Sequence, residues 1–443
     1  MDAHELQKSL QVTAADAVAV ARSLGADQVE AGLSFDEGLS VVVRMGELES
    51  IERQRDHTLA ITVYVGGRKG TASTTQSSPA ALEATARKAL SIASFTAEDE
   101  YAGLADEQLM TTEIRDLDLY HPWELTVEAA EELARRAEDT ARAIDPRIKN
   151  SEGASVATGA GVQVYANSHG FCGGYPTTSH SLSCGVVAEG EDALERDYWV
   201  TAARNAEFLE TPEHVGTEAA QRTLRRLGAR QFSTRQVPVV YPAEVARGLF
   251  GHLISAIRGT SQYREASFLL DACGDRIFPE FIEIDEDPFI LGAMASAPFD
   301  SDGVATRQRK LIDAGVLQGY FLSSYSARRL GLETTANAGG IHNLVVRPTA
   351  GSLQQLLGDL PGVFLVGELL GQGVNTVTGD YSRGAAGFWV ENGEIVYPVH
   401  EVTIAGNLKD LFLGIQAVGS DIDVRGTVRC GSVLVEGLTV AGH

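Results

Sequence analysis

The chain has 443 residues, of which 44% are hydrophobic and 22% charged, and its formal net charge at pH 7 is -24. This length exceeds what one hydrophobic core usually organises, so two or three folded domains are expected, and the composition is not that of a disordered chain. The excess of negative charge repels nucleic acid and anionic membranes, which excludes both as sequence-independent partners and favours proteins or peptides.

The location indicated by the sequence is the cytoplasm. The first residues, Met1 to Glu5, are acidic where a secretory signal would be basic and then apolar, and no run of about 18 apolar residues could span a bilayer. The cysteines are widely spaced and form neither a CxxC pair nor a disulfide framework. They are Cys172, Cys184, Cys273 and Cys430.

The N-terminal elements are set by hydrophobic periodicity and by helix caps. Apolar residues at the helical period predict a helix over 3–24 that stops at Gly25, and Ser78-Pro79 is typical of the start of a helix that runs to Phe95. Alternating segments between the two helices predict strands near 28–34, 39–45 and 59–66.

The middle of the chain follows the same logic. Thr126 caps a strongly periodic helix that ends near Ile144. Four strands are then expected at 153–158, 162–167, 180–188 and 195–203, with turns at 159–161 and 167–170. A helix at 213–227 carries Arg222, Arg225 and Arg226, which we interpret as a solvated face.

The C-terminal part begins near residue 235. A short buried strand at Val237–Tyr241 precedes a helix over 243–257, and a glycine-rich, strand-rich remainder contains a hairpin at Asn392-Gly393 and a last strand at 431–435. These elements predict the α+β class. We expect an N-terminal helix and antiparallel-sheet domain at 1–234, with a possible split near 120, and a β-rich domain at 235–443.

The helix over 243–257 lacks most of a metal site. Zinc on a helix needs two ligands on one face and a carboxylate to take a proton from the bound water. Only His252 is present, Arg247 and Gly248 stand where the companions would be, and the chain contains no HExxH motif. On this ground alone His252 is interpreted as a core or cap histidine.

A second candidate site lies in the glycine-flanked segment that contains Asp380, Tyr381, Ser382 and Arg383. It is expected to form a loop. Such a loop could line a groove in which backbone amides add to an extended peptide. The alternative is a structural turn held by an ion pair between Asp380 and Arg383.

Several strings together resemble the TldD/PmbA family of bacterial metalloproteases, from about residue 25 to the end of the chain. The strings are Tyr64 with 68–73, 167–170, 248–252, 379–393, 404–410 and 430–434. In sequence the chain is similar to the PmbA branch of this family, also called TldE.

The resemblance implies a zinc motif that this chain has lost. The TldD branch carries HExxxH and a later cysteine ligand; placed on this sequence, the first histidine becomes Arg247, the glutamate becomes Gly248, His252 remains, and Cys430 is the later cysteine. An arginine in the place of a ligand would repel a divalent cation. We therefore expect no metal or cofactor in this chain and zinc in a TldD-like partner.

The resemblance further implies a subunit of a TldD/TldE heterodimer that acts on unfolded or flexible peptides, with peptide-antibiotic (microcin) maturation and antitoxin degradation as roles of the family. Two rivals stay open. One is an autonomous peptidase that uses His252, Cys430 and a third ligand such as His342, His400 or Glu401. The other is a non-catalytic peptide-binding homodimer.

Overall fold

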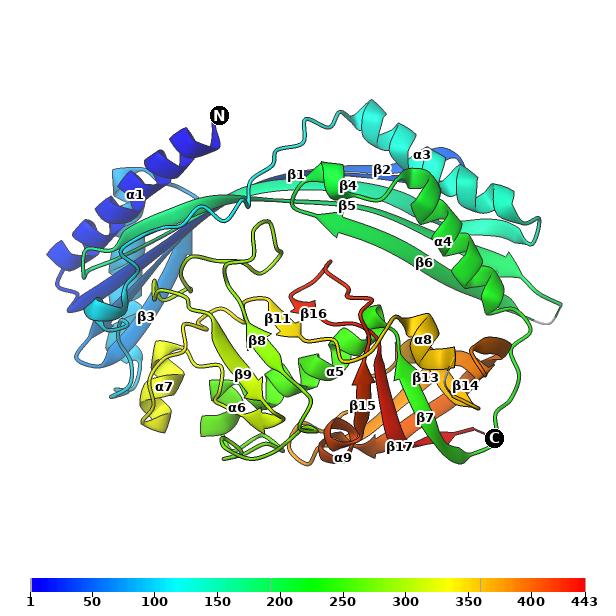
Figure 1. Cartoon of the computed structure of the whole chain (residues 1–443). Coiled ribbons are helices and arrows are strands. Elements are labelled where there is room, and N and C mark those ends of the chain that lie inside the picture. Colours follow the sequence, from blue (N-terminus) through cyan, green and yellow to red (C-terminus); the bar gives the residue numbers. More distant parts are fainter. Residues whose placement is uncertain (1, 192, 359, 443) are drawn as a thin grey trace.

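Two layers make up the molecule in a computed structural model that describes residues 2–191, 193–358 and 360–442 (Figure 1). A long sheet from the N-terminal half arches over a compact C-terminal part. Helices pack against strands in both layers, which confirms the α+β class. Among the helices of the described residues, none combines the length and the apolar character that a membrane crossing requires.

The arching sheet has six strands in the order β3-β2-β1-β4-β5-β6, and every neighbouring pair is antiparallel. Buried residues alternate along its strands, as at Val29, Ala31 and Leu33, because one face lies under helices. The strands are β1 (Gln28–Arg44), β2 (Glu47–Val65), β3 (Arg68–Thr74), β4 (Ile148–Asn167), β5 (Cys172–Glu189) and β6 (Leu194–Ala203).

Four helices cover the outer face of this sheet in two pairs. At one end α1 (Ala3–Ser23) and α2 (Pro79–Phe95) bury alanines and leucines against β1 to β4, and at the other end α3 (Val127–Ile144) and α4 (Pro212–Arg225) pack on β1, β4 and β5. The side chains of Ser78 and Thr126 cap α2 and α3, as their sequence predicts. Two short 3₁₀ helices, η1 (Glu107–Leu109) and η2 (Ala206–Phe208), lie in the connections.

The turn predicted at 159–161 is wrong, because these residues lie inside β4. The strand is continuous from Ile148 to Asn167, and Gly159 lies opposite Gly38 of β1. A Cβ on Gly161 would stand 2.4 Å from a carboxylate oxygen of Asp36. Glycine in a strand interior marks a close approach as often as a turn, and that is its role here. Gly38 likewise lies inside a strand, so the two strands predicted near 28–34 and 39–45 are one strand, β1.

The C-terminal part contains two sheets around a large hydrophobic core. One sheet has the order β14-β13-β12-β7-β17-β15 and the other β10-β9-β8-β11-β16. The strands of these two sheets are β7 (Arg235–Tyr241), β8 (Ile284–Glu286), β9 (Arg309–Asp313), β10 (Val316–Leu317), β11 (Leu344–Val346), β12 (Val363–Leu370), β13 (Asp380–Glu391), β14 (Glu394–Asn407), β15 (Ile415–Val418), β16 (Val428–Arg429) and β17 (Val433–Ala441).

The helices of this part are short, apart from the one that joins the two sheets. That helix, α5, spans Ala243–Ala256 and contacts β7, β12 and β16. The others are α6 (Gly259–Tyr263), α7 (Ser324–Leu330), α8 (Leu353–Gly358) and α9 (Leu408–Leu413). The connection that contains residue 120 links α2 to α3, and strands on both sides of it belong to the one arching sheet.

Two helical glycines give a matched test of this packing. A Cβ on Gly216 of α4 would lie 2.1 Å from the carbonyl oxygen of Ala137 on α3, whereas a Cβ on Gly248 of α5 meets nothing within 4 Å. Gly216→Ala should therefore lower the free energy of unfolding by about 1–3 kcal/mol, and Gly248→Ala should raise it by about 0.5–1 kcal/mol. Urea denaturation checks both values, and destabilisation by Gly248→Ala would contradict the open space described at that position.

Candidate functional site: the cavity beside helix α5

Helix α5 presents two different faces. Ala246, Leu249, Phe250 and Leu253 recur at helical spacing and are buried in the core. Arg247 and Gly248 lie on the other side, which is exposed. Arg247 and Gly248 thus face the space between the two layers and point away from the core.

Arg247 stands at a position where the resemblance implies a metal ligand, and its side chain faces a carboxylate. Its Nη1 lies 3.9 Å from Oδ2 of Asp423, whose side chain is almost fully buried. Arg425 binds the same carboxylate through two hydrogen bonds, of 2.9 and 3.0 Å. Burial alone would raise the pKa of Asp423, but the hydrogen bonds from Arg425 and the charge of Arg247 outweigh it and hold that pKa below its ordinary value.

The other two motif positions lie nearby but are not poised to bind a metal. The Cys430 side chain is fully buried, and burial together with the negative charge of Asp423 raises its pKa to about 12, so that the group is a thiol at neutral pH. The ring of His252 meets Tyr381 edge-on, with 6.0 Å between centroids. Burial, aided by the positive charge of Arg383, lowers the pKa of His252, so its imidazole is neutral.

Zinc does not fit these residues. A zinc site needs three protein ligands around one point, but at the ligand positions that the resemblance implies Arg247 supplies a cation and Cys430 a thiol whose pKa is raised. Gly248 supplies no carboxylate that could take a proton from a bound water. Within the described ranges, His, Cys, Asp and Glu side chains form no group of three or more that could hold a metal ion. The residues at the positions implied by the resemblance therefore lack the chemistry of a zinc site.

The third ligands that an autonomous peptidase would need lie elsewhere. The ring of His342 lies 2.8 Å from the carbonyl oxygen of Ala336 and lines a different cavity, between β1, β4 and residues 297–301. His400 lines a small pocket with Glu195 and Phe388. Glu401 is exposed on β14. In the part of the chain that the structure describes, none of these three joins His252 and Cys430 in a metal-binding group.

The segment from Asp380 to Arg383 is the start of strand β13, so the loop expected there is wrong. Its backbone pairs with β14 on one side. On the other side Ser382 N donates to Gly373 O (2.7 Å) and Asn375 N donates to Asp380 O (2.9 Å), so a peptide strand added here would have to displace that segment. Tyr381 is buried, whereas Ser382 is exposed.

The alternative ion pair between Asp380 and Arg383 is absent from the described side chains. Asp380 instead accepts a hydrogen bond from the hydroxyl of Thr378 (2.6 Å). Arg383 donates from Nε to the carbonyl oxygen of Leu370 (3.1 Å) and lines a cavity together with Arg247 and Gly248. The structure thus brings one residue of the expected groove into the cavity that Arg247 and Gly248 line.

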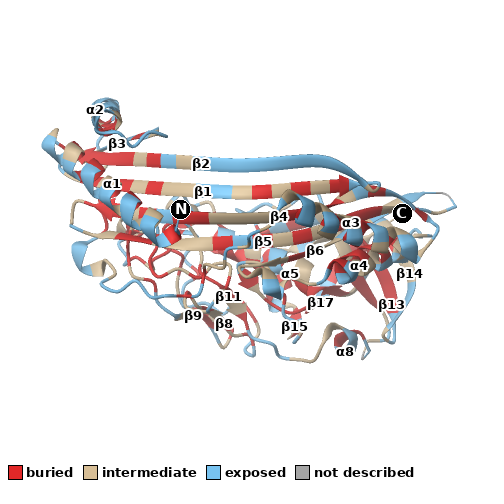
Figure 2. Cartoon of the chain, turned by 90° about the horizontal axis from the view of Figure 1, so that it is seen from above, coloured by how far each residue is buried: buried red, intermediate tan, exposed pale blue. Residues whose placement is uncertain are grey.

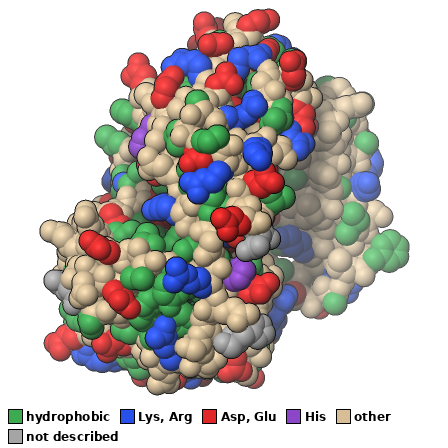
Figure 3. Space-filling view, turned by 90° about the vertical axis from the view of Figure 1, so that its right-hand side faces the viewer, with side chains coloured by type: hydrophobic (Ala, Val, Ile, Leu, Met, Phe, Trp, Pro, Cys, Tyr) green, Lys and Arg blue, Asp and Glu red, His purple; other side chains and the backbone are tan. Residues whose placement is uncertain are grey.

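That cavity, of about 380 Å³, lies between the two layers. Six arginines and four carboxylates line it, with Trp199, Tyr198 and a few aliphatic side chains: Arg196, Arg222, Arg226, Arg247, Arg383 and Arg425 against Glu152, Asp197, Glu244 and Glu368. Figure 3 shows the hollow between the layers with Lys and Arg side chains on its rim. An arginine excess is unusual on a chain whose net charge is -24.

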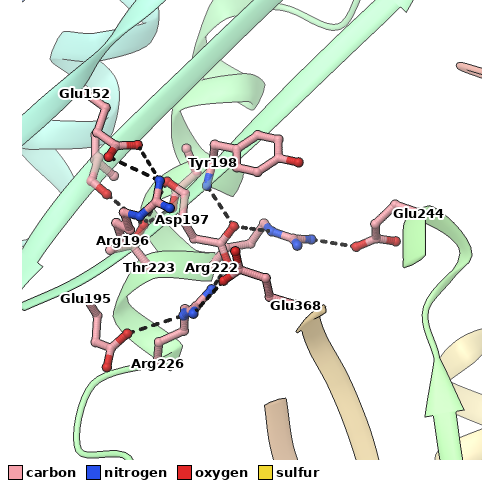
Figure 4. A network of polar contacts seen from close by, with 12 residues as sticks. Glu152, Glu195, Arg196, Asp197, Tyr198, Arg222, Thr223, Arg226, Glu244 and Glu368 are labelled. Carbon is pink, nitrogen blue, oxygen red and sulfur yellow. Dashed lines mark hydrogen bonds and ion pairs between the residues drawn. The ribbon is translucent and has the colours of Figure 1, made fainter. Parts of the chain in front are cut away.

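The solvated face predicted for the α4 arginines is wrong for two of them, because Arg222 and Arg226 are largely buried and paired across the cavity (Figure 4). Arg222 Nη1 lies 2.7 Å from a carboxylate oxygen of Glu244 on α5, and Arg226 Nη2 lies 2.9 Å from Glu368 on β12. Both also pair with Asp197 of β6 at 3.4 Å. The network joins the arching sheet to the C-terminal part.

The sequence did not predict most of the residues that line this cavity. The signals available were the cluster of arginines near 225 and the Asp423-Val424-Arg425 string, and neither shows which carboxylate it meets. Trp199 is a further wall residue, with the Arg425 guanidinium 4.4 Å from its ring centroid and the Arg222 guanidinium at 5.3 Å.

Comparison with known proteins agrees with this architecture. Residues 29–93, 120–227 and 234–442 match domain 1, the central domain and the C-terminal domain of the PmbA/TldA metallopeptidases. The chain therefore belongs to the PmbA/TldD family of metallopeptidases, which confirms the resemblance seen in the sequence.

Particular relatives are similar over almost the whole chain. Metalloprotease PmbA of Escherichia coli O157:H7 is 50% identical over 417 residues, which is 94% of this chain and 93% of that protein. A PmbA homolog of Haemophilus influenzae is 44% identical over 438 residues, covering 99% and 97%.

Solved structures show the same fold. A putative modulator of DNA gyrase from Bacteroides thetaiotaomicron matches with a TM-score of 0.93 at 28% identity, over 97% of this chain and 98% of that one. TldE from Thermococcus kodakarensis matches with a TM-score of 0.85 at 21% identity, over 96% and 99%, and supports the fold alone.

The charge beside His252 generates a prediction. Arg383→Gln removes the positive charge that opposes protonation of the imidazole, so the pKa of His252 should rise, although burial should still keep it below the ordinary value of 6.5. An NMR titration of the ring protons measures this, and His252→Gln identifies the signal. Arg347→Gln, which alters an exposed arginine paired with Asp285, is the control and should leave the titration unchanged. An unmoved His252 in Arg383→Gln would contradict the assigned cause.

Proposed function

We propose that this chain is the subunit without zinc of a two-subunit metalloprotease, in which a TldD-like partner holds the metal and this chain helps to form the site or channel that receives flexible peptides. One observation carries the proposal. All three domains of the family match, between residues 29 and 442, yet α5 presents Arg247 and Gly248 where the resemblance implies the zinc motif.

Electrostatics supports the division of labour. A guanidinium at the motif position opposes a divalent cation, and a thiol with a pKa of about 12 would have to lose its proton before it could bind one. Without Glu at position 248, no carboxylate stands beside His252 on the helix to take the proton of an attacking water. Hydrolysis is then the work of the partner.

A free sheet edge supports a partner chain. Residues 47–56 of β2 are exposed throughout, and β3 pairs with β2 only from Leu59 onwards, so in the described structure no strand borders the outer edge of this segment. Figure 2 shows this half of β2 as an exposed outer strand. Leu48 and Ile51 are 40% and 47% exposed on it. Strand edges of this kind pair readily with another chain.

The cytoplasm remains the proposed location. All four cysteines are free, as is usual where thiols are kept reduced. The proposed substrates are unfolded or flexible peptides.

The test compares this chain alone with this chain mixed with a TldD-like protein. The mixture should elute as one complex, contain about one zinc ion per pair and cleave an unfolded polypeptide, whereas this chain alone should contain no stoichiometric zinc and cleave nothing. Stoichiometric zinc in the isolated chain, with cleavage lost in His252→Ala, would overturn the proposal in favour of an autonomous peptidase. Peptide binding by a self-associated chain that forms no complex would favour the homodimer.

A matched pair of variants tests the proposed contact. Ile51→Lys places a charge on the free edge of β2 and should weaken the complex at least about tenfold. Ile92→Lys, on the exposed face of α2, where the residue is 38% exposed, should not. Equal complex formation by both variants would show that the partner does not bind at β2. The comparison of zinc content and cleavage would still test the proposed function.

A further inference from the structure

We infer that the cavity beside α5 is a carboxylate-binding site, in which Arg247 and Arg383 take a carboxylate of a bound peptide at the position where the family's zinc motif lies. This rests on the proposed function only in taking a peptide as the source of the carboxylate.

Four of the six arginines in the cavity already have a carboxylate partner. Arg196, Arg222, Arg226 and Arg425 each have a hydrogen-bonded or ion-paired carboxylate within 3.4 Å. Among the described residues, Arg383 has no carboxylate partner at all, and its one hydrogen bond goes to a backbone carbonyl through Nε. That bond leaves both Nη groups of Arg383 available to a ligand.

Arg247 is the second incompletely paired cation. Its carboxylate neighbour, Asp423, lies at 3.9 Å, too long for a hydrogen bond, and is already occupied by the two bonds from Arg425. The side chain of Arg247 is 44% exposed. A planar fork of donors at this position suits the two oxygens of a carboxylate.

Gly248 leaves room for the ligand between the helix and the opposite wall. A side-chain atom added there would meet nothing within 4 Å, and Gly248 and Gly367 both line the cavity. The volume of about 380 Å³ is at the small end of the range for ligand sites and suits one or two residues of a peptide. Trp199, Val200, Val245 and Leu369 supply apolar wall for a side chain.

The charge of the walls selects the kind of anion. Four carboxylates also line the cavity, and they repel a doubly charged phosphate about twice as strongly as a carboxylate. Asp423, 3.9 Å from Arg247, offsets part of the charge of the two open guanidinium groups, so that they suit the single charge of a carboxylate. The carboxylate could come from the end of a peptide or from an acidic side chain within it. Both sources share the same chemistry, and the experiment separates them.

The experiment is a calorimetric titration of the full chain with three N-acetylated tetrapeptides: tetra-alanine as the free acid, the same peptide as the C-terminal amide, and an amide with glutamate at the third position. The free acid should bind at least about tenfold more tightly than its amide, as a charge-assisted hydrogen bond predicts. Tighter binding of the glutamate peptide than of the free acid would assign the site to side-chain carboxylates, and equal binding of these two peptides would assign it to carboxylates of either source.

Variants locate the binding. Arg383→Gln and Arg247→Gln should each weaken binding of the carboxylate peptide about tenfold or more, whereas Arg347→Gln, on an exposed arginine outside the cavity, should change it less than twofold. The comparison of acid with amide needs no variant, so it stands even if a variant folds poorly. Equal affinity for all three peptides, no binding of any, or binding unaffected by both cavity variants would overturn the carboxylate site.

Complex formation with a TldD-like protein, followed separately by size-exclusion chromatography, reports on the proposed function. A complex that forms and cleaves while all three peptides bind equally would retain the subunit role and remove the carboxylate site. Selective carboxylate binding without any complex would do the reverse.

Discussion

The arginine and carboxylate network between the two layers is the interaction on which the arrangement of the site depends. Arg222 of α4 and Arg226, which directly follows that helix, reach across to Glu244 on α5 and Glu368 on β12, and Asp197 of β6 lies between the two arginines (Figure 4). The two arginines and Asp197 are largely withdrawn from water, so each charge needs its partner: the removal of one would leave the other buried and unpaired. The network therefore fixes where α5 stands relative to the arching sheet.

With α5 fixed in this way, small changes on one helix decide what the cavity can do. Arg247, to which the resemblance assigns the first histidine of the zinc motif, lies beside a carboxylate shared with Arg425. Gly248, to which it assigns the glutamate, leaves open space. Helix α5 and strand β13 thus bring the guanidinium groups of Arg247 and Arg383 to one cavity, where they oppose a cation and suit the anion that we propose.

Local features of the sequence predicted much of the fold. The caps at Ser78 and Thr126 and the hairpin at Asn392-Gly393 depend on neighbours along the chain, so their residues are enough to indicate them. Glycines at 159–161 led to the prediction of a turn, but they lie within β4, where they allow a close approach to the neighbouring strand.

The site was less predictable because its contacts are long-range. Arg226 meets Glu368, 142 residues further along the chain, and Arg222 meets Glu244, 22 residues along. No local pattern distinguishes these arginines from Arg225 in the same helix. The positions of the zinc motif, in contrast, were inferred from the resemblance to the family. The residues that surround Arg247 and Cys430 are known only from the structure.

The central claim is that α5 carries no metal while a partner chain does. The most direct measurement is an anomalous difference map, recorded at the zinc absorption edge, from crystals of this chain in complex with a TldD-like protein. The account predicts a zinc peak in the partner alone. A peak at bonding distance, about 2.0–2.3 Å, from an imidazole nitrogen of His252 or from Sγ of Cys430 would contradict it.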